Sequence, residues 1–359
     1  MTPIDGVAVV YCDGAFQTTN GKTAHGLVRF TDRYRVAAVI DRTCAGQDAG
    51  TLLDRGPAGI PIVGSLAEAL ATAGSAGLRT THFVIGIAPD GGRFTEAMLA
   101  AVREAIAADL HVDAGLHDFL TDYEDIVAAS EARGVRLRDV RRPPPRKELH
   151  AFTGKIEQVT SMVVAVLGTD SAVGKRTTAW MIVHGFRAAG RTAEMVGTGQ
   201  TAWLQGARFS FVEDALISDF MAGEIEHATW SAWNEEHPDV IVVEGQGGLL
   251  NPGYPGGYEI VAAARPDVIV LQHAPARKEY DGFPGYPIQR LPYQIDIAER
   301  ISGKPVGAIT LNHEGLDPSE IGMICKGMSL ALGIPVFDVV EDGPAGLVEA
   351  LSAYLPKSK

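Results

Sequence analysis

Apolar runs alternate with amphipathic stretches along the chain, which is the pattern of an α/β protein. In the first half this pattern predicts strands over residues 7–11, 36–40, 82–87 and 135–140, and helices over 65–73, 95–108 and 123–132. The first of these helices has a capping-box start, because Ser65 is followed three residues later by Glu68. We therefore expect a small, Rossmann-like domain built on a parallel sheet.

The second half restarts the pattern with an uninterrupted apolar strand, Met162 to Leu167. Further strands are predicted over residues 193–196, 240–243, 268–271 and 306–311, and helices over 175–189, 214–234, 295–301 and 345–355. Strands that alternate with helices favour a second parallel sheet with helical layers.

A basic, proline-rich segment separates the two halves. Pro143, Pro144 and Pro145 are consecutive and cannot lie in a central strand or a helix interior. We predict a Rossmann-like domain over residues 1–142, a linker over 143–150, and a second domain over 151–359.

The composition narrows the classes of partner. The chain has 359 residues, 46% of them hydrophobic, and 44 acidic against 31 basic residues give a formal net charge of −13. Non-specific nucleic-acid binding needs the opposite charge balance, so we expect no nucleic-acid partner. No apolar stretch reaches the roughly 18 residues of a membrane helix. The three cysteines, Cys12, Cys44 and Cys325, lie too far apart in the sequence for a zinc motif. We expect a cytoplasmic protein without membrane contact or a bound metal.

The strongest chemical signal is the segment GTDSAVGKRTT, residues 168–178, between a predicted strand and a predicted helix. In this context a glycine-containing loop directs backbone N–H groups and a helix N-terminus at a phosphate. Lys175 supplies the positive charge. The spacing departs from the usual loop, because five residues separate Gly168 from Gly174, and Arg176 stands where Ser or Thr normally holds magnesium. Either Thr177 or Thr178 supplies that hydroxyl, or the loop holds phosphate without metal.

The second signal is an acidic residue at the tip of a buried strand, in the segment VIVVEGQGGLLNP, residues 240–252. Ligands of α/β proteins bind at the carboxyl edge of the sheet. Glu244 is therefore a candidate base or magnesium ligand.

Together, the GTDSAVGKRT and EGQGGLLNP segments resemble the P-loop enzymes of the dethiobiotin synthetase type. That resemblance implies a P-loop NTPase-like second domain. It also implies an ATP- and magnesium-dependent ligase or kinase as one candidate function. A nucleotide-binding switch with negligible turnover is a further alternative.

Further segments do not belong to dethiobiotin synthetase: GTGQT at 197–201, DALISDFMAGEIE at 214–226, RKEY at 277–280, GIAPDGGRF at 86–94 and GLHDFL at 115–120. With these segments the chain is similar, over nearly its whole length, to the DgcN-like family. Its members are assigned as D-glutamate N-acetyltransferases that use acetyl-CoA. The resemblance implies transfer of acetyl from acetyl-CoA to the amino group of D-glutamate, without a metal, and we expect a homodimer.

The resemblance assigns roles to residues as hypotheses. The catalytic candidates are Glu244, Asp214 and Lys175. The candidates for holding acetyl-CoA are Thr169, Asp170, Ser171, Ala172, Val173, Gly174, Lys175, Arg176 and Thr177. The candidates for binding the substrate are Arg176, Gln200, Thr201, Asp219, Gln246, Arg277, Lys278 and Tyr280.

Two expectations concern the rest of the molecule. In a chain of net charge −13, Lys175, Arg176, Arg277 and Lys278 must gather in one local pocket to hold CoA phosphates and a dicarboxylate. The N-terminal half has no GxGxxG fingerprint. Closure over the active cleft, binding of part of CoA, and dimerisation all stay open as roles for it.

Overall fold

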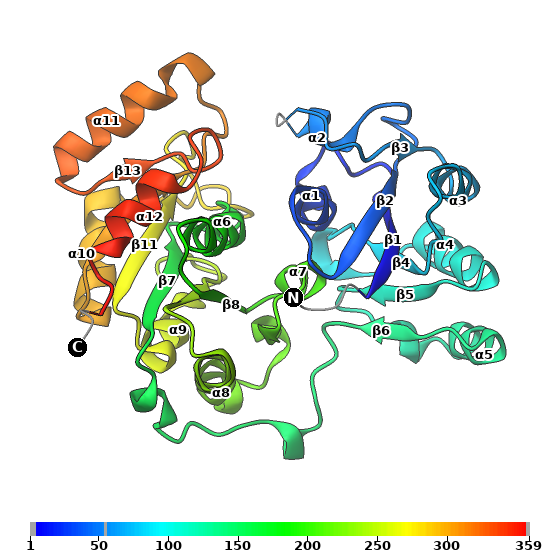
Figure 1. The fold of residues 1–359 in the computed structure, drawn as a ribbon, viewed down its shortest axis with the longest axis horizontal. Coiled ribbons are helices and arrows are strands. Elements are labelled where there is room, and N and C mark those ends of the chain that lie inside the picture. Colours follow the sequence, from blue (N-terminus) through cyan, green and yellow to red (C-terminus); the bar gives the residue numbers. More distant parts are fainter. Residues whose placement is uncertain (1–4, 54–55, 357–359) are drawn as a thin grey trace. The chain divides into compact units, whose positions relative to one another are not determined.

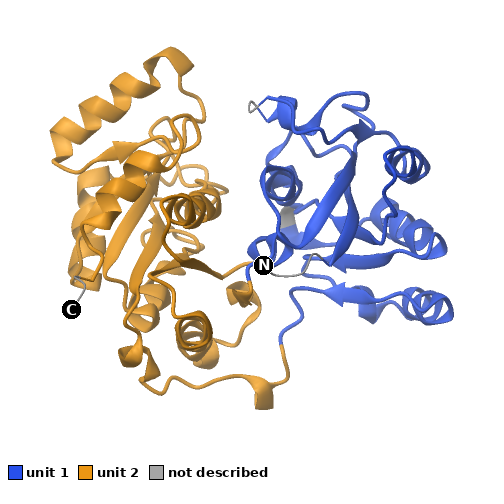
Figure 2. Ribbon diagram, viewed as in Figure 1, with its two compact units in different colours: residues 1–143, 200–207 blue, residues 144–199, 208–359 orange. Residues whose placement is uncertain are grey.

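The computed structural model describes residues 5–53 and 56–356, and the chain forms two compact units (Figure 2). Unit 1 contains residues 1–143 and 200–207, and unit 2 contains residues 144–199 and 208–359. The chain therefore passes from one unit to the other three times. The predicted second domain, 151–359, included residues 200–207, which the structure groups with unit 1.

Unit 1 is built on a six-stranded, all-parallel sheet with the order β3-β2-β1-β4-β5-β6 (Figure 1). This is the strand order of Rossmann folds, so the predicted fold class is confirmed for this unit. The strands are β1 (Gly6–Tyr11), β2 (Tyr34–Ile40), β3 (Ile62–Val63), β4 (His82–Ile85), β5 (His111–Ala114) and β6 (Leu137–Asp139).

Apolar side chains of both sheet faces form the core of unit 1, because successive strand residues point to opposite faces. Val9, Phe83 and Val112 pack on one side with α3 (Leu66–Ser75), α4 (Glu96–Ala107) and α5 (Glu124–Arg133). The opposite face lies against α1 (Lys22–Arg29) and α2 (Ala49–Leu52). The Ser65 cap predicted for α3 is confirmed, since Ser65 Oγ accepts from Glu68 N–H at 3.2 Å, while the Glu68 carboxylate accepts from Gly64 N–H at 2.9 Å instead of closing the box on Ser65.

An acidic residue ends β2, where a Rossmann domain commonly holds a ribose. In this unit the fully buried Asp41 carboxylate instead accepts N–H from Phe16 at 2.9 Å and from Thr43 at 2.8 Å. It therefore fixes two loops of the sheet edge, and these bonds occupy both of its oxygens.

Helix α7 (Gln200–Gln205) completes the second face of unit 1, although it follows a strand of unit 2 in sequence. Leu204 is fully buried among Ala8, Val10 and Leu27. Gln205 Nε2 donates to the carbonyls of Gly26 and Phe30 at 2.9 Å each, at the C-terminal end of α1. The short helix is held by these tertiary contacts, since six residues form no stable helix alone.

Unit 2 is built on a seven-stranded, all-parallel sheet with the order β13-β12-β11-β7-β10-β8-β9. Its strands are β7 (Met162–Gly168), β8 (Ala193–Gly197), β9 (Phe209–Ser210), β10 (Val240–Glu244), β11 (Val268–His273), β12 (Val306–Leu311) and β13 (Val336–Phe337). The central strand β7 is buried at every residue, which explains its continuous apolar sequence. The predicted α/β class is confirmed here too.

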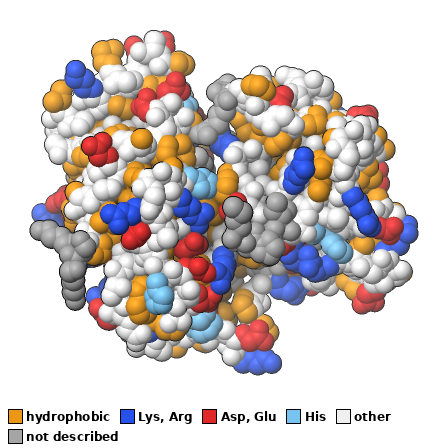
Figure 3. Space-filling model, viewed as in Figure 1, with side chains coloured by type: hydrophobic (Ala, Val, Ile, Leu, Met, Phe, Trp, Pro, Cys, Tyr) orange, Lys and Arg blue, Asp and Glu red, His pale blue; other side chains and the backbone are white. Residues whose placement is uncertain are grey.

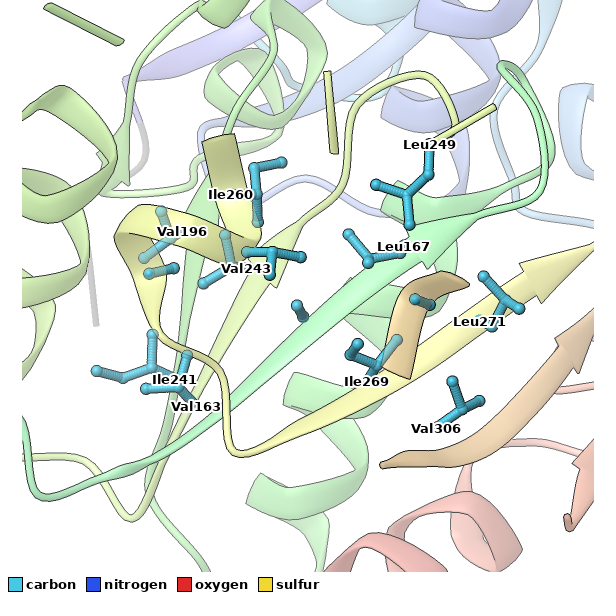
Figure 4. Close-up of a cluster of buried hydrophobic side chains, with 14 of the residues drawn as sticks. Val163, Leu167, Val196, Ile241, Val243, Leu249, Ile260, Ile269, Leu271 and Val306 are labelled. Atoms are coloured by element: carbon cyan, nitrogen blue, oxygen red, sulfur yellow. The ribbon is translucent and has the colours of Figure 1, made fainter. Parts of the chain in front are cut away.

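Helices cover both faces of this sheet. Val163, Leu167 and Ile269 belong to the apolar cluster of one face (Figure 4), against α8 (Ser218–Glu236), α9 (Gly257–Ala264), α10 (Leu291–Ser302) and α11 (Ile321–Leu332). The other face carries α6 (Lys175–Ala188) and α12 (Ala345–Ser352).

Several elements differ from their predicted bounds. The helix predicted from residue 214 begins at Ser218, because a 3-10 turn (Glu213–Ala215) precedes it, and the helix predicted over 295–301 begins at Leu291. The prediction omitted α1, α2, α7, α9 and α11, the four-residue strand β5, and the two-residue strands β3, β9 and β13.

On the face in Figure 3, Lys and Arg side chains are interspersed with Asp and Glu. Within residues 5–53 and 56–356, no helix has the length and apolar character needed to cross a membrane.

The packing of α7 predicts that Leu204→Ala destabilises unit 1. A leucine-to-alanine change in a packed core costs about 2–5 kcal/mol. We expect a lower denaturation midpoint and faster amide exchange in β1, β2 and β4. The matched control is Leu330→Ala on α11, where the leucine is 78% exposed and the cost is within about 0.5 kcal/mol. Equal stability of the two variants would show that α7 does not hold the core of unit 1.

Candidate active site

The P-loop of unit 2 connects the end of β7 to the start of α6. Gly174 has a φ of 106°, and the helix begins at the next residue, Lys175. A Cβ on Gly168 would lie 2.9 Å from Lys175 Cδ, so only glycine lets this side chain cross the end of the strand. The N-terminus of the 14-residue helix α6 adds a favourable dipole for an anion at this edge.

Lys175 is buried at the centre of the site. Its Nζ donates to the carbonyl oxygens of Asp170 at 2.7 Å and Gly247 at 2.6 Å. Burial lowers the pKa of Lys175 to about 8, and the nearby carboxylates of Glu244 and Asp170 oppose this effect. The amine therefore begins to lose its charge just above neutral pH.

The carboxylate of Asp170 is fully buried and joins three loops. Its Oδ1 accepts from Asn251 Nδ2 at 2.7 Å, and its Oδ2 accepts from Arg277 Nη1 and Asp281 N–H at 2.9 Å each. Ser171 N–H also donates to Oδ1 at 2.7 Å. These loops follow β7, β10 and β11, three neighbouring strands, so one side chain ties the edge of the sheet together.

The segment after β11 contains three residues predicted to bind substrate. Arg277 donates to Asp170, to the carbonyl oxygen of Ser171 at 2.8 Å, and to Glu314 Oε2 at 3.0 Å. Lys278 is exposed. Tyr280 is buried, and its hydroxyl has no hydrogen-bond partner among the described residues.

Glu244 lies at the end of β10, beside β7 and β8. Its Oε2 accepts from Thr198 N–H at 3.1 Å, and Gln246 Nε2 donates to the Thr198 carbonyl oxygen at 3.0 Å. Burial raises the pKa of Glu244, opposed by the cations Arg176 and Lys175 and by the Thr198 N–H. The structure thus brings the two strongest sequence candidates, Lys175 and Glu244, to one edge of one sheet.

The remaining P-loop candidates have varied surroundings. Thr169 Oγ1 and His273 Nδ1 are hydrogen-bonded at 3.0 Å, and Ser171 Oγ donates to Asp281 Oδ2 at 3.2 Å. Ala172 is exposed, Val173 is buried and Thr177 is partly exposed. The Thr178 hydroxyl donates to Gln272 Oε1 at 2.5 Å, so in this structure it is directed into the sheet.

Four candidates lie outside this cluster. Asp214 and Asp219 are exposed, and Asp219 is in the first turn of α8. Gln200 and Thr201 belong to unit 1, where Thr201 Oγ1 lies 3.0 Å from Thr23 Oγ1 and Gln200 packs against Gly115.

Sequence reasoning missed polar residues that the structure places in the cluster. Asn251 lies in the EGQGGLLNP segment and Thr198 in the GTGQT segment, and neither had been given a role. Asp281 acts through its backbone N–H, which no side-chain pattern reveals. Glu213 is buried one residue before the candidate Asp214. The sequence feature that could have indicated its burial is its position directly after the apolar residues Phe211 and Val212.

Asp170→Asn is predicted to destabilise unit 2, because it removes the buried charge that faces Arg277. Breaking a buried ion pair from one side costs about 3 kcal/mol or more. The matched control is Glu314→Gln, which removes the 62% exposed partner of the same arginine and costs about 1 kcal/mol or less. Urea denaturation measures both, and a loss of similar size in the two variants would contradict the role given to Asp170.

Comparison with known proteins places both halves of the chain in one family. Residues 150–348 match the family described as "Domain of unknown function (DUF1611_C) P-loop domain", and residues 42–143 match its "Rossmann-like domain" (DUF1611_N). A crystal structure of a DUF1611 family protein from Anabaena variabilis superposes with a TM-score of 0.88. It shares 28% identity over 97% of this chain and 99% of that one.

Two curated relatives carry a named activity. A protein from Tritonibacter scottomollicae called "D-glutamate N-acetyltransferase" is 32% identical over 293 residues, 79% of this chain and 84% of the relative. A protein of the same name from Pseudoalteromonas sp is 29% identical over 284 residues, 77% of this chain and 83% of the relative. With a P-loop domain, a Rossmann-like domain and whole-chain structural similarity, this chain belongs to the DUF1611 family.

Proposed function

We propose that this protein transfers the acetyl group of acetyl-CoA to the amino group of D-glutamate at the carboxyl edge of the unit 2 sheet. The observation that carries the proposal is the 32% identity, over 79% of the chain, to a relative named for this activity. Lys175 and Glu244, the residues that the motifs single out, lie together at this edge, which agrees with a site there.

The P-loop suits the phosphates of CoA without any phosphoryl transfer. CoA carries a pyrophosphate and a ribose 3′-phosphate, and the helix α6 N-terminus with Lys175 provides a favourable anion site. Arg176 replaces the magnesium-binding hydroxyl of a usual P-loop. Acyl transfer needs no metal, so this reaction does not require a magnesium-binding hydroxyl at position 176.

The reaction also needs a proton acceptor and donors for the tetrahedral oxyanion. Of the predicted acids, Glu244 is buried close to Lys175, whereas Asp214 and Asp219 are exposed. The Gly248 N–H donates to the Tyr254 carbonyl oxygen at 3.0 Å, so our candidate for the oxyanion site is the neighbouring Gly247 N–H, on the segment that lies against the P-loop.

The direct test incubates the protein with D-glutamate and acetyl-CoA and follows free thiol release, with and without EDTA. We expect thiol release that EDTA leaves unchanged. ATP consumption that requires magnesium, without thiol release, would overturn the proposal in favour of a ligase or kinase. Tight nucleotide binding without turnover would overturn it in favour of a switch.

The pKa of Lys175 predicts a pH dependence of CoA binding. Because the ammonium loses its proton as pH rises through about 8, the affinity for CoA should fall between pH 7 and pH 9. Lys175→Met should bind about tenfold more weakly or worse at pH 7, since one charge-assisted hydrogen bond contributes about 1.5–3 kcal/mol. The variant should also show a flatter pH profile. Calorimetric titration measures both, and parallel profiles for the two proteins would rule out Lys175 as a phosphate ligand.

A further inference from the structure

Glu213 is a buried carboxyl in the 3-10 turn that follows β9, and no motif had marked it. Its side chain is 3% exposed, and within residues 5–53 and 56–356 its Oε2 has no hydrogen-bond partner. Buried polar atoms are rarely left without a partner, and a catalytic role is one of the explanations for an exception. This atom therefore needs an explanation.

Glu213 belongs to the same cluster as Glu244. The N–H of Glu213 donates to the Thr198 carbonyl oxygen at 2.9 Å, while Thr198 N–H donates to Glu244. A Cβ on Gly256 would lie 2.9 Å from Glu213 Oε1 and 3.1 Å from Gln246 Cβ, so the carboxyl packs beside Gln246. Thr198 thus connects both acids and Gln246 at the ends of β8 and β10.

The two acids differ in the charges around them. Glu244 is close to Arg176 and Lys175 on α6. The charged groups that act on Glu213 are all acidic: Glu259 on α9, Asp214 on the same turn and Glu244 on β10. Burial, together with these acids, raises the pKa of Glu213 to about 9.

Among residues 5–53 and 56–356, no cation is therefore one of the groups that shift the pKa of Glu213, whereas two cations act on Glu244. A positive group within about 4–6 Å lowers the pKa of a carboxyl by about 1–3 units. The substrate of the proposed reaction carries one such group, the α-ammonium. A divalent metal is the other possible counter-charge, but no described cluster of three His, Cys, Asp or Glu side chains is arranged to hold one.

We propose that the Glu213 carboxyl binds the ammonium group of the acidic amino-acid substrate and accepts its proton during acetyl transfer. This inference rests on the proposed function and names the catalytic base. It assigns that role to Glu213 in place of Glu244, whose charge is balanced by the two cations of the P-loop helix.

The proton balance of the step is complete. Binding of the ammonium releases the proton of Glu213 to solvent, and the carboxylate then takes one proton from the ammonium. The free amine attacks the thioester carbonyl carbon, so that the C–N bond forms and the C–S bond breaks. The CoA thiolate leaves and takes up the second proton lost by the nitrogen. The products are the N-acetyl amino acid and CoA thiol.

The inference is tested with Glu213→Gln, an isosteric change that keeps the side chain neutral. The matched control is Glu349→Gln, the same substitution at an exposed position of α12. The first readout is proton release at pH 8 in weakly buffered solution. We expect about half a proton to one proton per D-glutamate bound by the unmodified protein and by Glu349→Gln, because the carboxyl ionises beside the ammonium. Glutarate, which has both carboxylates but no ammonium, should release none.

The second readout is thiol release with acetyl-CoA. Glu213→Gln should lower kcat about 100-fold or more, the usual contribution of a general base, and should release no proton with D-glutamate. Its KM for acetyl-CoA should stay unchanged. Glu244→Gln should instead raise the KM for acetyl-CoA, because it removes the negative charge that stabilises the protonated side chains of Lys175 and Arg176.

A fourth variant covers the case in which Glu213→Gln does not fold. Glu259→Gln removes one of the acids that raise the pKa of Glu213, so the rising limb of kcat/KM against pH should move to lower pH. An unmoved limb would overturn the inference. Full activity or unchanged proton release in Glu213→Gln would also overturn it, and the proposed function would stand. Absence of thiol release in the unmodified protein would instead overturn the proposed function.

Discussion

The candidate site depends on one buried carboxylate, Asp170, and on the bonds that satisfy it. Four donors from three loops converge on its two oxygens, and one of them, Arg277, balances its charge. The loops follow adjacent strands, so the bonds fix the P-loop against the segments after β10 and β11. That arrangement leaves the Lys175 amine between two carbonyl oxygens at the end of β7. An unpaired charge at this depth would cost about 3–5 kcal/mol.

Although the chain as a whole is acidic, the cations of the site lie close to acidic partners. Arg277 is hydrogen-bonded to Asp170 and Glu314, and Lys278 is exposed. The pocket of four cations that the sequence predicted is therefore not formed. Lys175 and Arg176 both lie close to Glu244. The backbone N–H groups of the P-loop and the N-terminus of α6 therefore have a large part in any phosphate binding here. They carry no formal charge, so the nearby acids do not neutralise them as they do a cationic side chain.

Local patterns predicted the strands, the P-loop and the sheet-edge acid, because each of these depends on residues close together in sequence. The strand β7 with its loop and α6 is the clearest case, and the fold class followed from the alternation of such elements. Three of the four donors to Asp170 come from positions 251, 277 and 281, so no local pattern contains them. Helix α7 was missed because its six residues hold their form only through packing on unit 1. Glu213 and Asp214 are neighbours in sequence with opposite burial, and only tertiary packing separates them.

In the proposed reaction a carbon–nitrogen bond forms between an acetyl group and D-glutamate. The most direct measurement uses acetyl-CoA labelled with ¹³C at the acetyl carbonyl, incubated with the protein and D-glutamate and followed by ¹³C NMR. We expect the thioester signal to be replaced by that of the amide carbonyl of N-acetyl-D-glutamate. Label that stays in the thioester, or that appears only in free acetate, would contradict it.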